Sequence, residues 1–492
     1  MRLALPASVK HSALLLAVLL AACGTSESSQ VEIVAIGEPG SLFQTTGRLP
    51  LPAQLLRGAT AEGLVSLDAQ GLVIPGVADR WIVTDDGLSY IFRLRDANWR
   101  DGTPITAETA RIALRRAIAA LGGTPMAPDL AALDEVLVMT GRVIELRLTR
   151  PEPQLLNLLA QPELGLVREG RGAGPMRLQR EGPRATLVPI EPEKRGLPAV
   201  EDWQERVRPL RLTALPASRA IKGFNLGQVN AVLGGGFEYF PVVDATPLAR
   251  AAIQLDPVAG LFGLIVVHAD GFLAEPANRE AIAMAIDRDR LAASFRVGGW
   301  APSSRVYPAG LEDDPGGSGE RWSMLSLAQR RAVAMARVSR WRAARPGPVR
   351  LRLALPVGPG ADRLFGNLAL DLGQAGLAAV RVGLGDPADL RLVDAVARYP
   401  RAAWYLNQLS CASKRGLCSP EADRDFAAAW DAPDAATRSA LLTSAAAGLT
   451  DANVFIPFGP PIRWSLVRGD TTGFAANRLG YHPLMPLALR PR

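Results

Sequence analysis

The sequence predicts a mixed α/β protein, with helices and strands interspersed (α+β), built from more than one domain. Predicted strands and helices alternate along the chain, which is the pattern of this fold class. Of the 492 residues, 48% are hydrophobic, which is enough for a large packed core, and the length suggests two or three domains. The 47 glycines and 39 prolines follow no fixed period, which excludes a collagen or a simple repeat.

The net charge of +7 comes mainly from arginine. No arginine cluster is interleaved with aromatic residues, as segments that bind nucleic acids are. The basic balance therefore predicts a solvated basic surface and no nucleic-acid partner.

The first 22 residues have the features of a secretory signal peptide. A weakly basic start precedes the apolar run 12–20, which is shorter than the roughly 20 residues that span a bilayer. The run ends in Leu-Ala-Ala-Cys, which resembles the lipobox of bacterial lipoproteins. We therefore expect cleavage before Cys23, lipid attachment to Cys23 and a polar tether at 23–30. The alternative is an ordinary signal peptide in which Cys23 is incidental. The expected location is the periplasm, at the inner or outer membrane.

The first elements after the tether are a strand and a hairpin. Residues 31–36 alternate between apolar and polar and predict an opening strand. Residues 81–83 and 90–94 flank Asp85-Asp86-Gly87, a turn sequence, and so predict a β-hairpin. One face of its second strand carries Tyr90, Phe92 and Leu94.

A helix and two strands follow. Thr106 can cap a helix that begins at Ala107, since Thr is a favoured N-cap residue. Alternation predicts a strand at 143–148, and a turn-rich Gly-Ala-Gly-Pro at 172–175 precedes a short strand at 176–178. The helix has one apolar stripe, formed by Ala110, Leu114, Ala117, Ile118 and Leu121.

The second half of the chain repeats this alternation. Residues 278–295 predict one helix, with Ile282 and Ile286 one turn apart. We expect a strand at 351–355 and helices at 361–375 and 435–449. These elements complete the α/β pattern.

In an oxidising compartment, the two cysteines that follow Cys23 are expected to be oxidised. Cys411 and Cys418 are an even pair, so we expect a disulfide that closes a short loop. A metal site is disfavoured because no histidine is near and two ligands do not complete a site.

Segments in the first quarter of the chain resemble the extracytoplasmic solute-binding proteins of ABC importers, in the peptide/nickel-binding family (family 5). The match is strongest at 62–68, 74–81, 84–95 and 99–108, although Thr109 replaces the acidic residue that closes the family pattern. Weaker matches are the Gly-Ala-Gly-Pro turn, the helix Asn278–Ile282 with Ile286–Arg288, Ile456-Pro457 and Val467–Gly469. The matching segments themselves are turns and apolar anchors, which identify a fold and not a ligand.

The resemblance implies a two-lobed clamshell of the periplasmic-binding-protein type II kind, with an extra domain. By this resemblance, lobe one comprises 31–53, 165–258 and 469–492, the extra domain 54–164, and lobe two 259–468. It also implies hinge closure on a buried solute, recognition by ABC permease subunits and a monomeric protein. An alternative is an envelope lipoprotein of the same fold that has lost transport and acts as a scaffold or chaperone.

The ligand candidates lie where the sequence departs from the family. Peptide binders often carry an acidic residue where this chain has Arg398, and Arg401 replaces a second acidic position. One hypothesis is that both arginines receive a carboxylate or phosphate, so the solute would be peptide-like or anionic. The other is that they face solvent or pair locally, for example with Asp394. The further candidates are Trp404, Tyr405, Asn407, Phe237, Tyr239 and His268.

Catalysis has little support in the sequence. The chain after residue 22 has only His268 and His482, and it has no nucleophile elbow, P-loop or zinc-protease motif. We therefore expect no catalytic residue, no metal and no cofactor. A periplasmic hydrolase remains a distant third hypothesis.

Overall fold

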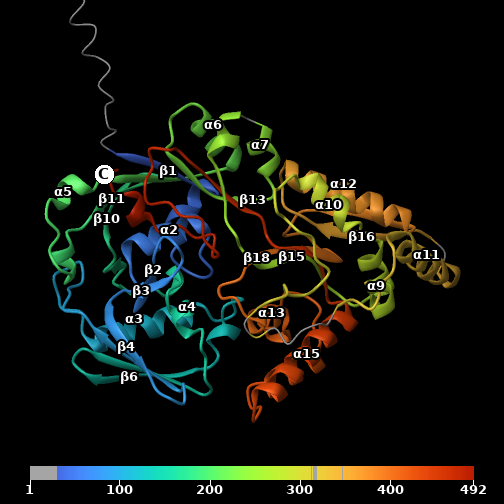
Figure 1. Cartoon of the computed structure of the whole chain (residues 1–492), viewed down its shortest axis with the longest axis horizontal. Helices are drawn as coiled ribbons and strands as arrows, with labels where there is room; N and C mark the ends of the chain where they lie inside the picture. The colour runs from blue at the N-terminus through green and yellow to red at the C-terminus, as the bar shows by residue number, and fades with distance from the viewer. Residues whose placement is uncertain (1–29, 246, 312, 314–318, 346, 492) are drawn as a thin grey trace, which may run out of the picture.

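The computed structural model describes residues 30–245, 247–311, 313, 319–345 and 347–491. These residues form two lobes that lie side by side, and a smaller domain lies below the first lobe (Figure 1). The predicted signal peptide, Cys23 and nearly all of the tether lie outside the described residues.

Lobe one is built on a seven-stranded mixed sheet in which β1 is central and covers the predicted opening strand. β1 pairs in parallel with β12 on one side and β13 on the other. In sheet order the strands are β10 (Met176–Glu181), β11 (Arg184–Pro189), β12 (Leu210–Leu215), β1 (Val31–Ile36), β13 (Ala231–Gly236), β20 (Arg463–Val467) and β14 (Ile253–Leu255). Its helices are η1 (Pro39–Phe43), α2 (Leu51–Thr60), η4 (Pro192–Arg195), α5 (Trp203–Arg206), α6 (Ala217–Asn225), α7 (Phe240–Ala245), α8 (Pro247–Ala252) and α16 (Leu484–Leu487).

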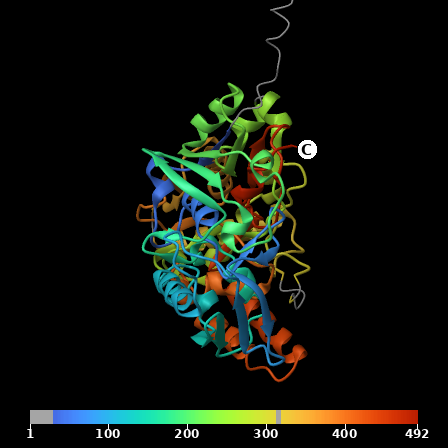
Figure 2. The same cartoon turned by 90° about the vertical axis from the view of Figure 1, so that its left-hand side faces the viewer.

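The smaller domain has a four-stranded antiparallel sheet that includes the predicted hairpin. Tyr90, Phe92 and Leu94 are buried on one face of β5, as predicted. In sheet order the strands are β4 (Ala78–Val83), β5 (Ser89–Leu94), β7 (Val143–Leu148) and β6 (Leu133–Thr140). The flanking elements are β2 (Val65–Leu67), β3 (Val73–Pro75), α3 (Ala107–Ala120), η2 (Pro128–Leu130), α4 (Leu155–Leu159), η3 (Pro162–Leu164), β8 (Val167–Arg168) and β9 (Arg171–Gly172). Figure 2 is viewed from the side of lobe one and this domain.

Two signature segments of this region serve packing. Thr106 caps α3 and forms a capping box with Thr109, so Thr109 takes over the role at that position. Gly172 and Gly174 lie directly on the end of α2, because a Cβ at either position would come within 2.3 Å of Ala61 or Thr60. The Gly-Ala-Gly-Pro turn therefore allows the chain to cross closely over that helix.

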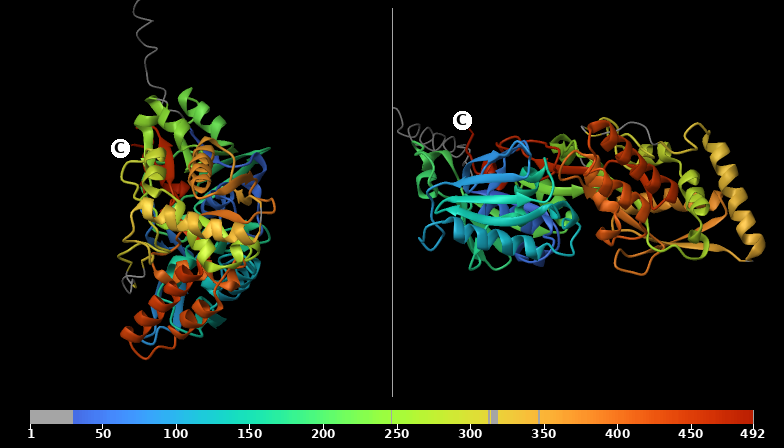
Figure 3. Two further views of the ribbon diagram at one scale, coloured as in Figure 1. Left: turned by 90° about the vertical axis from the view of Figure 1, so that its right-hand side faces the viewer. Right: turned by 90° about the horizontal axis from the view of Figure 1, so that it is seen from below.

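Lobe two is built on a five-stranded sheet whose outer face carries long helices. Figure 3 shows this lobe end-on and the two halves side by side from below. In sheet order the strands are β17 (Leu377–Val382), β16 (Val349–Ala354), β18 (Leu390–Val396), β15 (Gly260–Val266) and β19 (Phe455–Gly459). The helices are η5 (Gly271–Ala274), α9 (Pro276–Ala285), α10 (Arg288–Phe295), α11 (Leu327–Ala344), α12 (Pro359–Gln374), α13 (Ala402–Leu409), η6 (Cys411–Ser413), α14 (Pro420–Ala428) and α15 (Ala435–Ala452).

The single helix predicted at 278–295 is wrong, because the structure has two helices there. α9 ends at Ala285, Ile286 is extended, and the side chain of Asp287 accepts a hydrogen bond from the backbone N–H of Arg290 to begin α10. Asp371 of α12 accepts a hydrogen bond from the N–H of Asp287 at 3.0 Å. The break is stable because the Asp371 carboxylate accepts a hydrogen bond from the Asp287 N–H, which has no partner within a helix.

Two short segments cross between the lobes. β14 of lobe one leads into β15 of lobe two through 256–259, and β19 of lobe two leads back into β20 through 460–462. Residues 463–467 fall within the range predicted for lobe two, but they form β20 in the sheet of lobe one. The return crossing therefore lies earlier than the predicted boundary at 468.

Candidate functional site

A cavity of about 590 Å³ lies between the two lobes. Lobe one contributes the end of β13 with the residues after it, together with Arg48. Lobe two contributes β18, the start of the following loop, and side chains from α13 and from the loop 411–418. The volume falls in the range of small-molecule sites, and both lobes form the walls.

The glycine run 234–236 forms part of the lobe-one wall, where Gly234 and Gly236 line the cavity. Gly235 instead lies against the ring of Trp464, where a Cβ would come within 2.0 Å of the ring, and the Trp464 indole donates to the Gly236 carbonyl at 2.8 Å. Phe237 is buried among Phe262 and Phe295, whereas Tyr239 does line the cavity.

The cavity lining includes two carboxyl groups and one guanidinium that lie near one another, Glu238, Asp394 and Arg463. Arg463 of β20 reaches across the interlobe boundary and pairs with both carboxylate oxygens of Asp394 on β18, at 2.8 and 3.0 Å. Burial is the largest single influence on the pKa of Arg463 and lowers it, but the charge and hydrogen bond of Asp394, together with the charges of Glu238 and Asp256, raise it by more, so the net shift is upward. Burial, and then the charge of Asp394, raise the pKa of Glu238 to about 7. The Glu238 carboxyl group can therefore exchange a proton near neutral pH.

Three arginines also line the cavity. Arg48 lies between η1 and α2 of lobe one, and Arg398 and Arg415 come from lobe two. Burial is the main cause that lowers the pKa of Arg48, and the charge of Arg398 lowers it further. Burial, then Arg48 and Arg398, lower the pKa of Arg415 to about 10. Like charges from both lobes thus face one another.

Arg398 lines the cavity, as one of the two hypotheses requires, but it also contacts the smaller domain. One of its terminal nitrogens lies 3.3 Å from the Gln161 amide oxygen and 3.8 Å from the Glu163 carboxylate. Asp394 is not its partner, because Arg463 occupies that carboxylate. Arg401 lies at the start of α13, does not line the cavity and is within electrostatic range of Glu152.

The other candidates divide between cavity, core and surface. Trp404 is 1% exposed and lines the cavity, and its indole nitrogen has no hydrogen-bond partner among the described residues. Tyr405 is buried against Tyr307, and burial raises the pKa of its hydroxyl. His268 is exposed beyond the end of β15 and does not line the cavity.

Asn407 joins lobe two to the smaller domain. Its amide and the hydroxyl of Tyr399 both donate to one oxygen of Asp129, each at 2.9 Å. Gln408 donates to the carbonyl of Pro125 at 2.9 Å. Burial, partly offset by these donors, raises the pKa of Asp129 to about 6. These contacts hold lobe two against the smaller domain in this structure.

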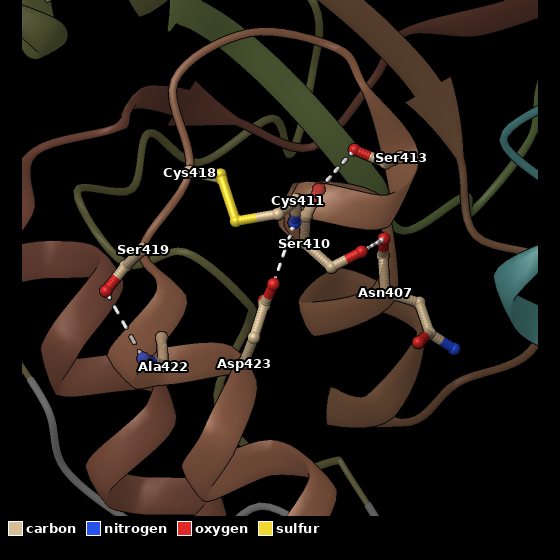
Figure 4. The surroundings of a disulfide bond; sticks show 8 residues. All are labelled: Asn407, Ser410, Cys411, Ser413, Cys418, Ser419, Ala422 and Asp423. Atoms are coloured by element: carbon tan, nitrogen blue, oxygen red, sulfur yellow. Dashed lines mark hydrogen bonds between the residues drawn. A yellow bond between two sulfur atoms is a disulfide. The ribbon is translucent and has the colours of Figure 1, made fainter.

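The structure forms the predicted disulfide between Cys411 and Cys418, with the Cα atoms 5.1 Å apart (Figure 4). The loop is held at both ends, since the N–H of Cys411 donates to Asp423 and the N–H of Leu417 donates to the carbonyl of Val266. Gly416 passes so close to β15 that a Cβ there would lie 2.5 Å from the Val266 carbonyl. The loop therefore places Arg415 at the cavity.

Sequence reasoning missed four charged groups of the site, Arg48, Glu238, Arg415 and Arg463. The sequence does draw attention to Arg415, because this residue lies inside the predicted disulfide loop. Glu238 lies between the two aromatic candidates Phe237 and Tyr239. Arg48 and Arg463 had no local signal. No helix in the described ranges could span a membrane, and those ranges hold no group of three or more potential metal ligands.

The comparisons with known proteins agree on one family. The model of the bacterial extracellular solute-binding proteins, family 5, matches residues 73–329. The probable deoxycholate-binding periplasmic protein YgiS of Escherichia coli K12 is 34% identical over 121 residues. That match covers 21% of this chain and only about a quarter, 23%, of the relative's length.

Solved structures match almost the whole chain. The Haemophilus influenzae OppA complex with RPPGFSPFR has a TM-score of 0.80 at 18% identity, over 94% of this chain and 99% of that one. The Escherichia coli murein tripeptide binding protein MppA has a TM-score of 0.78 at 18% identity, over 94% and 98%. These similarities establish the two-lobed fold.

Proposed function

Since the chain belongs to the bacterial extracellular solute-binding proteins, family 5, we propose that it captures a small solute in the interlobe cavity for an ABC importer. Proteins of this family are carriers and not enzymes. The observation that carries the proposal is the cavity of about 590 Å³ whose walls come from both lobes, beside the two crossing segments. The lobes close on the solute by bending at 256–259 and 460–462.

The solute is peptide-like or anionic. Relatives are named for oligopeptides, and the cavity offers charged groups of both signs, as a zwitterionic or acidic solute requires. Arg398, Trp404 and Tyr239 are the earlier candidates that line it. The partners are the solute and the permease subunits, and the protein acts as a monomer.

Protein purified from its own envelope is expected to carry a small molecule that native mass spectrometry detects. Adding that molecule back at a hundredfold excess over Kd should raise the unfolding free energy by about 2.7 kcal/mol, since a ligand that binds only the folded state stabilises it. Small-angle scattering should show a more compact particle with ligand than without.

The outcome that contradicts the proposal is the absence of any co-purified molecule together with no stabilisation across a broad metabolite and peptide panel. That result would favour a scaffold or chaperone of the same fold. A matched control is an exposed-surface variant such as Arg342→Gln, which should bind as the wild type does.

We also propose that the protein is a lipoprotein anchored through Cys23. A cell grown with labelled fatty acid should incorporate label into the wild-type chain and not into Cys23→Ser. The variant should be recovered in the soluble periplasmic fraction, because it lacks the acyl chains that hold the wild type at the membrane. Label retained by Cys23→Ser would refute the anchor and leave the binding proposal intact.

A further inference from the structure

Three arginines line the same cavity although they come from opposite lobes, Arg48 from lobe one and Arg398 and Arg415 from lobe two. In agreement with this placement, the charge of Arg398 lowers the pKa of Arg48, and the charges of Arg48 and Arg398 lower the pKa of Arg415. Such an arrangement opposes closure unless something negative lies between the lobes.

The protein's own carboxylates do not neutralise this group. Glu163 lies 3.8 Å from Arg398 and also accepts a hydrogen bond from Gln54. Asp129 acts on Arg398 and Arg415 but is already bound by Tyr399 and Asn407. Asp394 also attracts Arg48, but its carboxylate is paired with Arg463. Among the described residues, no carboxylate forms an ion pair with Arg48 or Arg415, so an anionic group of the solute can supply that contact.

Arg48 is the clearest sign of a place for a ligand. Its guanidinium makes no ion pair or hydrogen bond to any residue that the structure describes, and the residue is exposed by surface area. Yet surrounding protein lowers its pKa by desolvation. Because Arg48 lines the interlobe cavity, a ligand group in the cavity can reach its guanidinium.

Arg415 is held at the cavity by the disulfide loop. One terminal nitrogen donates to the amide oxygen of Gln408. The disulfide, the Asp423 contact and the close approach to β15 fix the loop on either side. Fixing a cation in a partly desolvated position is costly unless a partner of opposite charge occupies the site.

We propose that Arg48, Arg398 and Arg415 form an oxyanion site in which a carboxylate or phosphate group of the solute bridges the two lobes. This inference rests on the proposed solute-binding function and names the chemistry of one end of its ligand. Guanidinium groups suit such oxygens because they donate two parallel hydrogen bonds. The bridging anion converts repulsion between Arg48 and the lobe-two arginines into attraction, and so favours the closed state.

The experiment uses orthophosphate and succinate as minimal probes, at constant ionic strength in NaCl, with neutral succinamide as the matched control compound. Thermal unfolding should show saturable stabilisation of the wild type by at least one of the two anions and none by succinamide. The affinity should fall about tenfold or more in Arg48→Gln and Arg415→Gln, as expected for the loss of a charge-assisted contact. Arg342→Gln on the exposed face of α11 should keep the wild-type affinity.

Two further readouts separate a binding site from a structural role. Without any anion, Arg48→Gln should be at least as stable as the wild type, because the substitution removes repulsion. The double variant Cys411→Ser, Cys418→Ser should weaken anion binding in the wild-type background and have little further effect in Arg415→Gln.

Equal anion affinity in the wild type and both arginine variants overturns the oxyanion site, as does stabilisation no greater than that by NaCl. If the wild type then co-purifies with a neutral or cationic solute, the solute-binding function stands and only this inference fails. If the wild type binds neither an anion nor any envelope solute, both fail.

Discussion

Asp371→Asn is expected to lower the free energy of unfolding by about 3 kcal/mol, the low end of the range for breaking a buried ion pair. Asp371 is 1% exposed and accepts hydrogen bonds from Arg290, Arg331 and the backbone N–H of Asp287. Asparagine keeps the shape but leaves two guanidinium groups without an opposite charge. Both guanidinium groups are partly exposed, at 32% and 21%, which limits the loss.

The measurement is urea unfolding of the variant beside Asp362→Asn, a matched change on the same helix whose partner Arg381 is reached at the surface. The control should change stability by no more than about 1 kcal/mol. A double variant that also carries Arg331→Gln should lose less than the sum of the two single changes, because the groups interact. Additive losses, or equal losses in Asp371→Asn and Asp362→Asn, would show that Asp371 does not organise this part of lobe two.

Asp394→Asn is expected to cost about 1.5–3 kcal/mol at pH 5.5, the range for hydrogen bonds to a charged group. It leaves Arg463 without its main partner beside the return crossing. The loss should become smaller at pH 8. There the Glu238 carboxylate is ionised and within electrostatic range of Arg463, so it replaces part of the lost attraction.

The direction in which stability changes with pH follows from the pKa of Glu238. Its folded pKa of about 7 lies above the roughly 4.3 of an unfolded glutamate, so the folded state holds the proton more tightly. The stability from this group is complete below about pH 4 and is lost as the pH rises through 7. Asp394→Asn lowers the pKa of Glu238, so the wild type should lose more stability between pH 5.5 and 8 than the variant.

Urea unfolding at several pH values measures both effects, with Glu108→Gln as the control for an exposed pair. Parallel pH profiles for the wild type and Asp394→Asn would contradict the electrostatic link between Asp394 and Glu238. A shift to an open particle in small-angle scattering, without solute, would show in addition that the Arg463–Asp394 pair holds the lobes together.

Local chemistry was enough to predict several elements closely. β1 occupies the predicted range, and the hairpin and the capped helix α3 formed as expected. These elements depend on alternation, on a turn of Asp-Asp-Gly and on an N-cap, all of which act within a few residues. The disulfide also followed from sequence, since Cys411 and Cys418 are seven residues apart.

Contacts between distant residues could not be predicted in this way. The break between α9 and α10 depends on Asp371, which lies 84 residues beyond Asp287. Asp394 and Arg463 are 69 residues apart and meet only because strands from the sheets of different lobes, β18 and β20, approach each other near the crossing. Neither pairing leaves a periodic signal in the sequence.

The sequence by itself determined the family, the class of fold, the strands and caps, and the cysteine pair, because short-range sterics and hydrogen bonding fix these features. Only the tertiary structure decided which charges meet in the cavity. In the structure, Arg398 does not pair with Asp394, and Arg48 and Arg415 line the same cavity. Phe237 and Tyr405 are buried in the core, and His268 lies outside the cavity. The physical reason is that electrostatic interactions depend on distance in space, and the closure of two lobes sets that distance.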